Sequence, residues 1–152
     1  MVIGPSSLVK DCTVQRNLRN GIVTGDGVQV EGCLIGGDDD NGNGQFGLVG
    51  GQRMLVTRNT AIGNGDSGIL VGMNSTVTHN ISNENANDGI AVGQRSLVSH
   101  NTANDNEGDG IEAVCPSTVT DNQASDNGSL NFNFIGPGCF DKGNTSPNND
   151  PV

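Results

Sequence analysis

The sequence of 152 residues contains no tryptophan and no tyrosine, and only 32% of its residues are hydrophobic. Without Trp and Tyr, little aromatic surface is left for stacking sugars. Lys and Arg number 7 against 17 Asp and Glu. The resulting net charge of −10 argues against nucleic acid or an anionic membrane as a partner, because neutralising phosphate requires cations. No run is long or apolar enough to span a membrane.

The first ten residues, MVIGPSSLVK, lack the basic and apolar pattern of a signal peptide. Export is therefore either not encoded here or depends on a signal outside this chain. Met1 also falls one position past the place where a repeat would begin, so the first strand is expected to have an uncovered edge. Two interpretations stay open: the chain is part of a longer protein, or a second copy covers this edge in a homo-oligomer.

Glycine and asparagine are abundant instead, with 24 and 21 copies, and a Gly-Ile or Gly-Leu pair recurs along the chain. The intervals between the pairs are 26, 21, 21 and 21, and the longest one contains a five-residue surplus within GGDDDNGNG. One more step of 21 reaches Asn131-Phe132. This regularity indicates an internal repeat. The reference glycines of the repeat are Gly21, Gly47, Gly68, Gly89 and Gly110.

Residues at equal distances from these glycines form columns of one chemical type. The columns one and nine positions on are apolar and have polar neighbours, which predicts short strands with one buried face. The members are Ile22, Leu48, Ile69, Ile90, Ile111 and Phe132, and Val30, Val56, Val77, Val98 and Val119. Phe132, Phe134 and Phe140 fall in inward columns of the last repeat, where they are predicted to plug the core.

Two further columns consist of asparagine, twelve positions after and four positions before the glycine. Asn favours turns, and identical amides stacked about 4.8 Å apart can bond to one another. We therefore predict two corners in each repeat, each with an asparagine ladder. The two ladders are Asn59, Asn80, Asn101 and Asn122, and Asn17, Asn43, Asn64, Asn85, Asn106 and Asn127.

A chain whose sequence period equals its stacking period is a β-solenoid. Its rungs of 21 residues with Asn corners resemble the right-handed parallel β-helix, the fold of pectate lyases and many bacterial surface proteins. The rungs are most similar to those of uncharacterised bacterial β-helix proteins, which read GIxVGxxSxVxxN. The resemblance implies an all-β right-handed parallel β-helix of about six rungs over residues 1–140, followed by a tail over 141–152.

The four cysteines fall into two pairs. The resemblance implies a disulfide between Cys115 and Cys139, because the similar proteins carry VCPS and GxGC at these places, and such a bond favours an exported, oxidised location. Cys12 and Cys33 share one column on successive rungs. They are either two small apolar residues in place of ladder asparagines or a strained second disulfide.

The column eleven positions after the glycine carries the clearest candidate chemistry. It contains Arg58, His79, His100 and Asp121 on successive rungs. Stacked imidazoles can share a proton or hold a divalent ion, so these four are candidate catalytic residues. A solvated row of mixed charge is the alternative.

Acidic residues suggest a second candidate, a calcium site. Glu84, Asp105 and Asp126 stack in one column, and like charges so close can be relieved by Ca²⁺. In the surplus, Asp39 and Asn41 begin a D-x-N-x-N-G calcium pattern, although the closing Glu is replaced by Gly50. Calcium is thus possible and no cofactor is certain.

Two outward surfaces complete the set. Thr76, Thr78, Thr118 and Thr120 form T-x-T pairs that resemble those of ice-binding solenoids, although rungs with leucine interrupt them. An apolar outward column favours a protein interface. It consists of Val2, Val23, Val49, Leu70 and Ala91.

These observations favour a non-catalytic structural, glycan-binding or partner-binding module of an exported or surface bacterial protein. One alternative is a lyase, hydrolase or epimerase acting on an acidic polysaccharide, with Ca²⁺ or paired carboxylates. The NTD, DD, GHG and RIK set of galacturonan hydrolases and the DPHD motif of alginate epimerases are both absent. An ice-binding protein is a further alternative.

Overall fold

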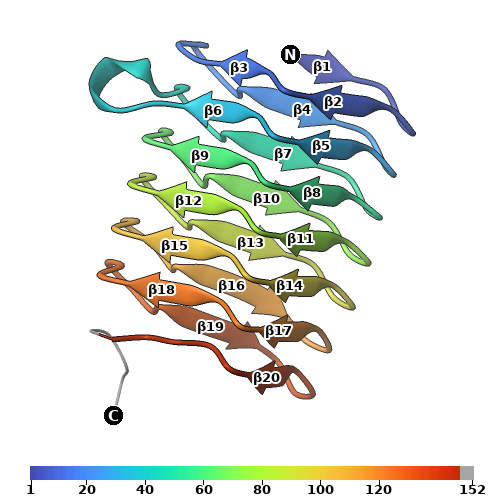
Figure 1. The fold of residues 1–152 in the computed structure, drawn as a ribbon, viewed down its shortest axis with the longest axis vertical. Coiled ribbons are helices and arrows are strands. Elements are labelled where there is room, and N and C mark those ends of the chain that lie inside the picture. Colours follow the sequence, from blue (N-terminus) through green and yellow to red (C-terminus); the bar gives the residue numbers. More distant parts are fainter. Residues whose placement is uncertain (148–152) are drawn as a thin grey trace.

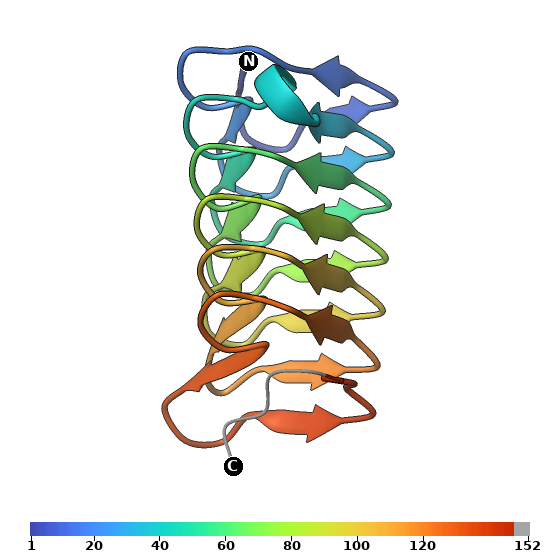
Figure 2. The same cartoon turned by 90° about the vertical axis from the view of Figure 1, so that its left-hand side faces the viewer.

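The computed structural model describes residues 1–147, with only the backbone described at Asp39. The chain winds as a right-handed coil whose turns stack into three parallel β-sheets, so the predicted all-β parallel β-helix is confirmed (Figures 1 and 2). Within residues 1–147, no helix has the length and apolar character needed to cross a membrane.

Each of the seven turns described contributes one strand to sheets A and B, and the first six also contribute one to sheet C. Sheet A contains β1 (Val2–Ile3), β4 (Ile22–Thr24), β7 (Leu48–Gly50), β10 (Ile69–Val71), β13 (Ile90–Val92), β16 (Ile111–Val114) and β19 (Phe132–Ile135). Sheet B contains β2 (Leu8–Lys10), β5 (Gln29–Glu31), β8 (Leu55–Thr57), β11 (Thr76–Thr78), β14 (Leu97–Ser99), β17 (Thr118–Thr120) and β20 (Phe140–Lys142). Sheet C contains β3 (Thr13–Val14), β6 (Leu34–Gly36), β9 (Thr60–Ile62), β12 (Ile81–Asn83), β15 (Thr102–Asn104) and β18 (Gln123–Ser125).

The register of the sheets follows the sequence repeat. Ile69 pairs with Ile90, 21 positions on, whereas Ile22 pairs with Leu48 across the longer interval. The surplus residues bulge out between β6 and β7 and contain a short 3₁₀ turn, η1 (Asp39–Asn41) (Figure 1). The coil has about seven turns rather than the six predicted, because the strand Val2–Ile3 before the first reference glycine already pairs with β4.

The core is thin and made of aliphatic side chains. Each of the five middle rungs places one large residue from sheet A, a valine from sheet B and a small or branched residue from sheet C inside the coil. Because each layer rests on the layers above and below, no rung buries its apolar side chains alone. In the middle of the coil the fully buried apolar residues include Ile69, Ile90, Ile111, Val77, Val98, Val119, Ala103 and Ala124.

Both asparagine ladders are confirmed. Within each ladder, an Oδ1 accepts bonds from the backbone N–H and the Nδ2 of the Asn before it, as Asn101 does from Asn80 at 2.9 and 3.0 Å. The Nδ2 of Asn80 also donates to the carbonyl of Val56 at 3.0 Å. The ladders run further than predicted, since Asn131 and Asn144 accept from Asn127 and Asn122 at 2.8 and 2.9 Å.

The last rung departs from the predicted register. Phe140 pairs with Thr118, 22 positions back, so the 136–139 turn holds one more residue than the repeat. Phe132 and Phe134 pack against the core as predicted, but Phe140 points outward with 57% of its surface exposed, so it is not part of a plug. The bridge between Gln123 and Thr145 extends the coil past the expected boundary at 140. Residues 148–152 of the predicted tail lie outside the described residues.

The structure joins Cys115 to Cys139 by a disulfide with Cα atoms 4.9 Å apart, the pair that the resemblance implied. Cys12 and Cys33 are free thiols, so the alternative of a second disulfide is wrong for this structure. Cys33 instead takes the part of a ladder asparagine, because its Sγ accepts the backbone N–H of Cys12 at 3.4 Å and its own N–H donates to Asn59. Burial and the neighbouring Cys33 raise the pKa of the Cys12 thiol to about 12.

Candidate functional site

The corner between sheets B and C turns through a single residue of positive φ on most rungs. Such a backbone is costly for most side chains but tolerated by Asn, Asp, His and Gly. These corner residues are exposed, and they form the column that the sequence singled out. Their φ angles are 50° for Asp11, 56° for Arg58, 58° for His79, 56° for His100 and 56° for Asp121.

The two histidines of this column stack on each other. Their ring centroids lie 4.9 Å apart and their planes differ by 4°. Arg58 does not join them, because its guanidinium forms a salt bridge of 3.1 Å with Glu31 on the preceding rung. The four candidate residues thus share one exposed corner, and their catalytic role stays a prediction.

The outer face of sheet B lies beside this corner. One of its columns alternates apolar and hydroxyl side chains, namely Leu55, Thr76, Leu97, Thr118 and Phe140. The other column is mostly hydroxyl, with Thr57, Thr78, Ser99 and Thr120. The threonine pairs therefore face outward as predicted, and the leucines interrupt the regular array that an ice-binding surface would need.

Charge is distributed unevenly around the coil. Sheet B and the turns on its two sides hold five Lys or Arg, five Asp or Glu and both histidines, so this face is formally neutral. The rest of the sequence has two Lys or Arg against twelve Asp or Glu and carries the entire net charge of −10. The cations of the neutral face are Lys10, Arg53, Arg58, Arg95 and Lys142.

A pocket of about 430 Å³ opens on this face at its last three rungs. It exists because the extra residue in the 136–139 turn directs Phe140 outward beside Thr118. The sequence repeat places Phe140 inside, and for that reason sequence reasoning missed the pocket. Its lining residues are Arg95, Ser96, Leu97, Pro116, Ser117, Thr118, Gly138 and Phe140.

The predicted calcium residues lie along the corner between sheets C and A. Glu84, Asp105 and Asp126 are exposed and stack on successive rungs with φ of 56–57°. Among the residues that the structure describes, no group of three or more His, Cys, Asp or Glu could hold a metal ion. Asn41 donates to the carbonyl of Asp38 at 3.0 Å, and the side chain of Asp39 lies outside the described part.

A second group of carboxylates lies on sheet A and the turn before it. Asp109 is buried and accepts the Leu130 N–H at 2.9 Å and the Asn133 amide at 2.7 Å. Burial, followed by the charges of Asp88 and Asp109, raises the pKa of Glu112. Burial also raises the pKa of Asp88. Such shifts make this group a candidate acid–base site.

The predicted apolar column shares this sheet with the carboxylates. Val23, Val49 and Leu70 are half-buried on the outer face, whereas Ala91 is buried between Leu70 and Glu112 and offers no contact surface. A protein interface at this column stays a prediction, as does a homo-oligomer through the N-terminal edge.

Comparison with known proteins agrees with this architecture. The model of the family described as "right handed beta helix region" matches residues 1–129. No curated protein matches the sequence. A double mutant of the periplasmic alginate epimerase AlgG is structurally similar, with a TM-score of 0.72 and 16% identity, over 95% of this chain and 46% of that one. The A-module of a mannuronan C-5 epimerase from Azotobacter vinelandii gives a TM-score of 0.69 and 14% identity, over 99% of this chain and 55% of the module. The chain thus spans about half the length of either structure.

Proposed function

Because the chain belongs to the right-handed β-helix family, we propose that it is a non-catalytic module that binds an acidic polysaccharide on the outer face of sheet B, within an exported or cell-surface bacterial protein. The observation that carries the proposal is the uneven charge: a strongly acidic chain keeps one face formally neutral and collects most of its cations there. The acidic residues outside this face lie mainly in the turns between sheets C and A, where they would repel a polyanion.

The shape of the face agrees with a linear polymer. Parallel strands stack into a surface along the coil axis, so outward side chains recur at one strand spacing, with hydroxyl groups on the middle rungs and cations on some of them (Figure 2). Contacts repeated along a chain add up even when each is weak. Both structurally similar proteins are named as enzymes of alginate or mannuronan, which are polysaccharides, and this supports the ligand class.

Binding isotherms with alginate and pectate, with dextran as the neutral control, test the proposal. We expect the chain to bind the acidic polymers, with affinity that falls as salt is added, since the attraction is screened. Thr78→Glu places a negative charge at the centre of sheet B and should weaken binding several-fold. Thr102→Glu is the matched control, because Thr102 is an equally half-buried strand residue on sheet C. Equal effects of the two variants, or no binding at low salt, would refute the proposal.

A second function is favoured by the carboxylates of sheet A. Two groups with raised pKa beside buried Asp109 are suited to proton transfer, so the chain would then act on an acidic glycan as a hydrolase, lyase or epimerase. Digestion of alginate and pectate, followed by chromatography and NMR of the products, tests this activity. Glu112→Gln should abolish it, whereas Thr78→Glu should reduce it only through binding.

A further inference from the structure

We propose that the pocket at the end of sheet B binds one uronic acid residue, with Arg95 holding the carboxylate and the Phe140 side of the pocket holding the sugar ring. The choice of a uronate as ligand rests on the proposed function. The pocket itself is defined by geometry that the rest of sheet B lacks.

Arg95 supplies a cation that no carboxylate of the described residues pairs with. Its Nε donates to the Asn74 side-chain oxygen at 3.3 Å, its Nη2 contacts the Met73 sulfur at 3.6 Å, and it forms no salt bridge within residues 1–147. A guanidinium presents paired N–H donors that match a carboxylate in a bidentate arrangement. An anionic group entering the pocket therefore meets an available partner.

Phe140 and Leu97 form the apolar side of the pocket. Both belong to the outward column of sheet B, and 57% of Phe140 and 38% of Leu97 are exposed. Pro116 and Gly138 line the pocket from the turns between sheets A and B, on the two rungs after Arg95. An exposed phenyl ring beside an apolar wall is a suitable surface for the C–H face of a sugar, and it is one of few aromatic rings in the chain.

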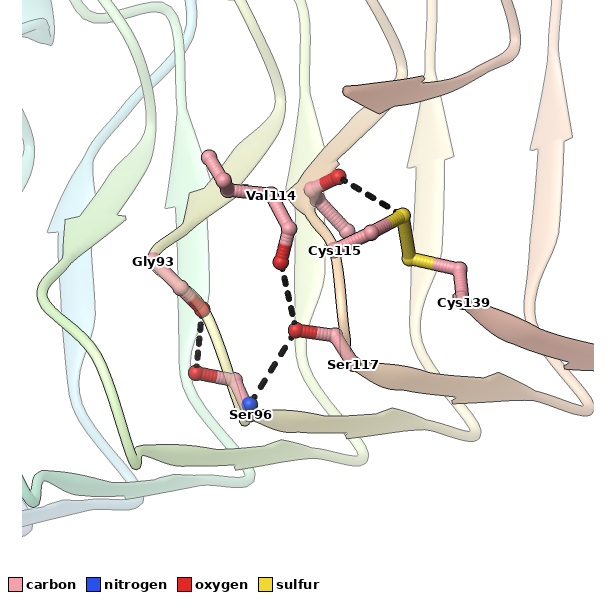
Figure 3. Close-up of a disulfide and its surroundings, with 7 residues drawn as sticks. Gly93, Ser96, Val114, Cys115, Ser117 and Cys139 are labelled. Atoms are coloured by element: carbon pink, nitrogen blue, oxygen red, sulfur yellow. Dashed lines mark hydrogen bonds between the residues drawn. A yellow bond between two sulfur atoms is a disulfide. The ribbon is translucent and has the colours of Figure 1, made fainter. Parts of the chain in front are cut away.

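The disulfide keeps this wall in place. Cys115 precedes Pro116, and Cys139 lies between Gly138 and Phe140, so the bond ties the two closing segments together (Figure 3). The Pro116 carbonyl in turn accepts the backbone N–H of Arg95 at 2.5 Å, which links the wall to the cation.

The floor of the pocket is already committed to the scaffold. The Ser96 hydroxyl donates to the Gly93 carbonyl at 2.7 Å, and the Ser117 hydroxyl donates to the Val114 carbonyl at 2.7 Å (Figure 3). Selectivity is therefore left to Arg95, the Thr118 hydroxyl and the apolar wall. A volume of about 430 Å³ is near the lower end for small-molecule pockets, which suits one or two sugar rings rather than a long oligosaccharide.

The chain contains a matched control two rungs earlier. Arg53 and Leu55 occupy the repeat positions of Arg95 and Leu97, with φ of 56° and 59° at the two arginines and 38% exposure at each leucine. Arg53, however, pairs with Asp26 at 3.2 Å, and the position that corresponds to Phe140, two rungs on, holds Leu97. The earlier pair therefore has the same chemistry without a free cation or an aromatic wall.

Sodium glucuronate and sodium galacturonate, with glucose and acetate as controls, can be titrated into the ¹⁵N-labelled chain and followed by NMR. We expect the uronates to shift the amides of Ser96, Leu97, Thr118 and Phe140, and glucose and acetate each to do so far more weakly. Arg95→Gln should weaken uronate binding about tenfold or more, as expected for the loss of a charged hydrogen bond, and Phe140→Ala should weaken it several-fold. Arg53→Gln and Leu55→Ala should leave it within twofold.

Shifts of equal size with glucose, shifts spread over the surface, or an Arg95→Gln variant that binds like the wild type would each overturn the pocket assignment. The proposed function is judged separately by the polymer isotherms. Polymer binding that survives in Arg95→Gln with Phe140→Ala refutes the pocket and leaves the face-wide proposal standing. Localised uronate shifts in a chain that binds no polymer would support the pocket and refute the face-wide proposal.

Discussion

Replacing Asn80 with alanine tests how much the asparagine ladders stabilise the coil. The Asn80 Oδ1 accepts the backbone N–H and the Nδ2 of Asn59, at 2.9 and 3.0 Å. Its Nδ2 donates to the carbonyls of Val56 and Thr78 and to Asn101, at 3.0, 3.1 and 3.0 Å. The residue is buried to 1% exposure, so water does not replace these partners without a local rearrangement.

Alanine at this position leaves the buried Asn59 N–H without its partner and removes the side-chain donor of the Val56 carbonyl, which stays within the paired strands β8 and β11. The Asn59 amide keeps its bonds to Val30 and Thr57, and the Asn101 Oδ1 keeps the backbone N–H of residue 80. A buried polar group left unpaired costs about 1–3 kcal/mol, so the substitution should cost at least about 1 kcal/mol. Residue 80 is not among the positive-φ residues, and alanine there adds no backbone strain.

Urea unfolding of wild type, Asn80→Ala and Asn87→Ala measures this cost as a change in midpoint at constant slope. Asn87 is the matched control, because it is an exposed asparagine whose amide reaches only Asp66 and Ser67. We expect the control to stay within about 0.5 kcal/mol of wild type. If Asn80→Ala lost no more than Asn87→Ala, the ladder would be a consequence of the stacking and would not help to hold it.

Three further predictions follow from other contacts. Gly68→Ala should destabilise the chain, because a Cβ there meets the Ser82 hydroxyl, the Asn85 Nδ2 at 2.6 Å and the Gly89 carbonyl at 3.0 Å. Gly4→Ala should leave the melting temperature unchanged, because a Cβ there has no atom within 4 Å. Thermal melts of both variants and the wild type measure the difference. Glu112→Gln should raise the melting temperature at pH 7. Folding raises the pKa of Glu112 above its ordinary 4.5, so ionisation of this carboxyl destabilises the native state. The gain in melting temperature should disappear below about pH 4, where the wild-type carboxyl is protonated in both states. Cys12 should react with iodoacetamide at pH 8 far more slowly in the native chain than in urea, because a thiol pKa of about 12 leaves almost no thiolate. The rates are read by mass spectrometry. Equal rates would contradict the burial of this thiol beside the Cys33 thiol.

The sequence predicts the middle of the coil well, and the reason is physical. A side chain such as Val77 or Asn101 has the same residue type above and below it, so one repeat determines the environment of the next. Inward and outward faces, both ladders and the stacked histidines all follow from the period of 21. The period also predicts the bulge at residues 36–44 as an insertion, because the strands before and after it pair in the regular register.

The candidate site was less predictable, because it depends on contacts that the period does not encode. Arg58 pairs with Glu31, 27 residues away, because its side chain reaches across to the preceding rung. The position of Arg58 in its sequence column does not predict this contact. That Phe140 is exposed depends on a single extra residue in the 136–139 turn, which shifts β20 by one position and reverses its faces. A one-residue slip moves every side chain of a strand to the other face, so a repeat that is almost regular predicts the wrong face there.

This slip connects the scaffold with the proposed ligand. In a perfect repeat Phe140 would be a core residue in the position of Val119, and sheet B would end as a row of leucine and threonine. The disulfide between Cys115 and Cys139 spans the same turn, so the bond and the extra residue act on one segment. The register shift turns an aromatic ring outward two rungs beyond Arg95. Unlike Arg53 in the same column of the repeat, Arg95 has no acidic partner within residues 1–147. Deleting Gly138 should therefore restore the regular register, bury Phe140 and remove the pocket together. A ¹⁵N spectrum in which the deletion variant keeps a folded coil and still shows uronate shifts at Leu97 would break this connection between register and binding.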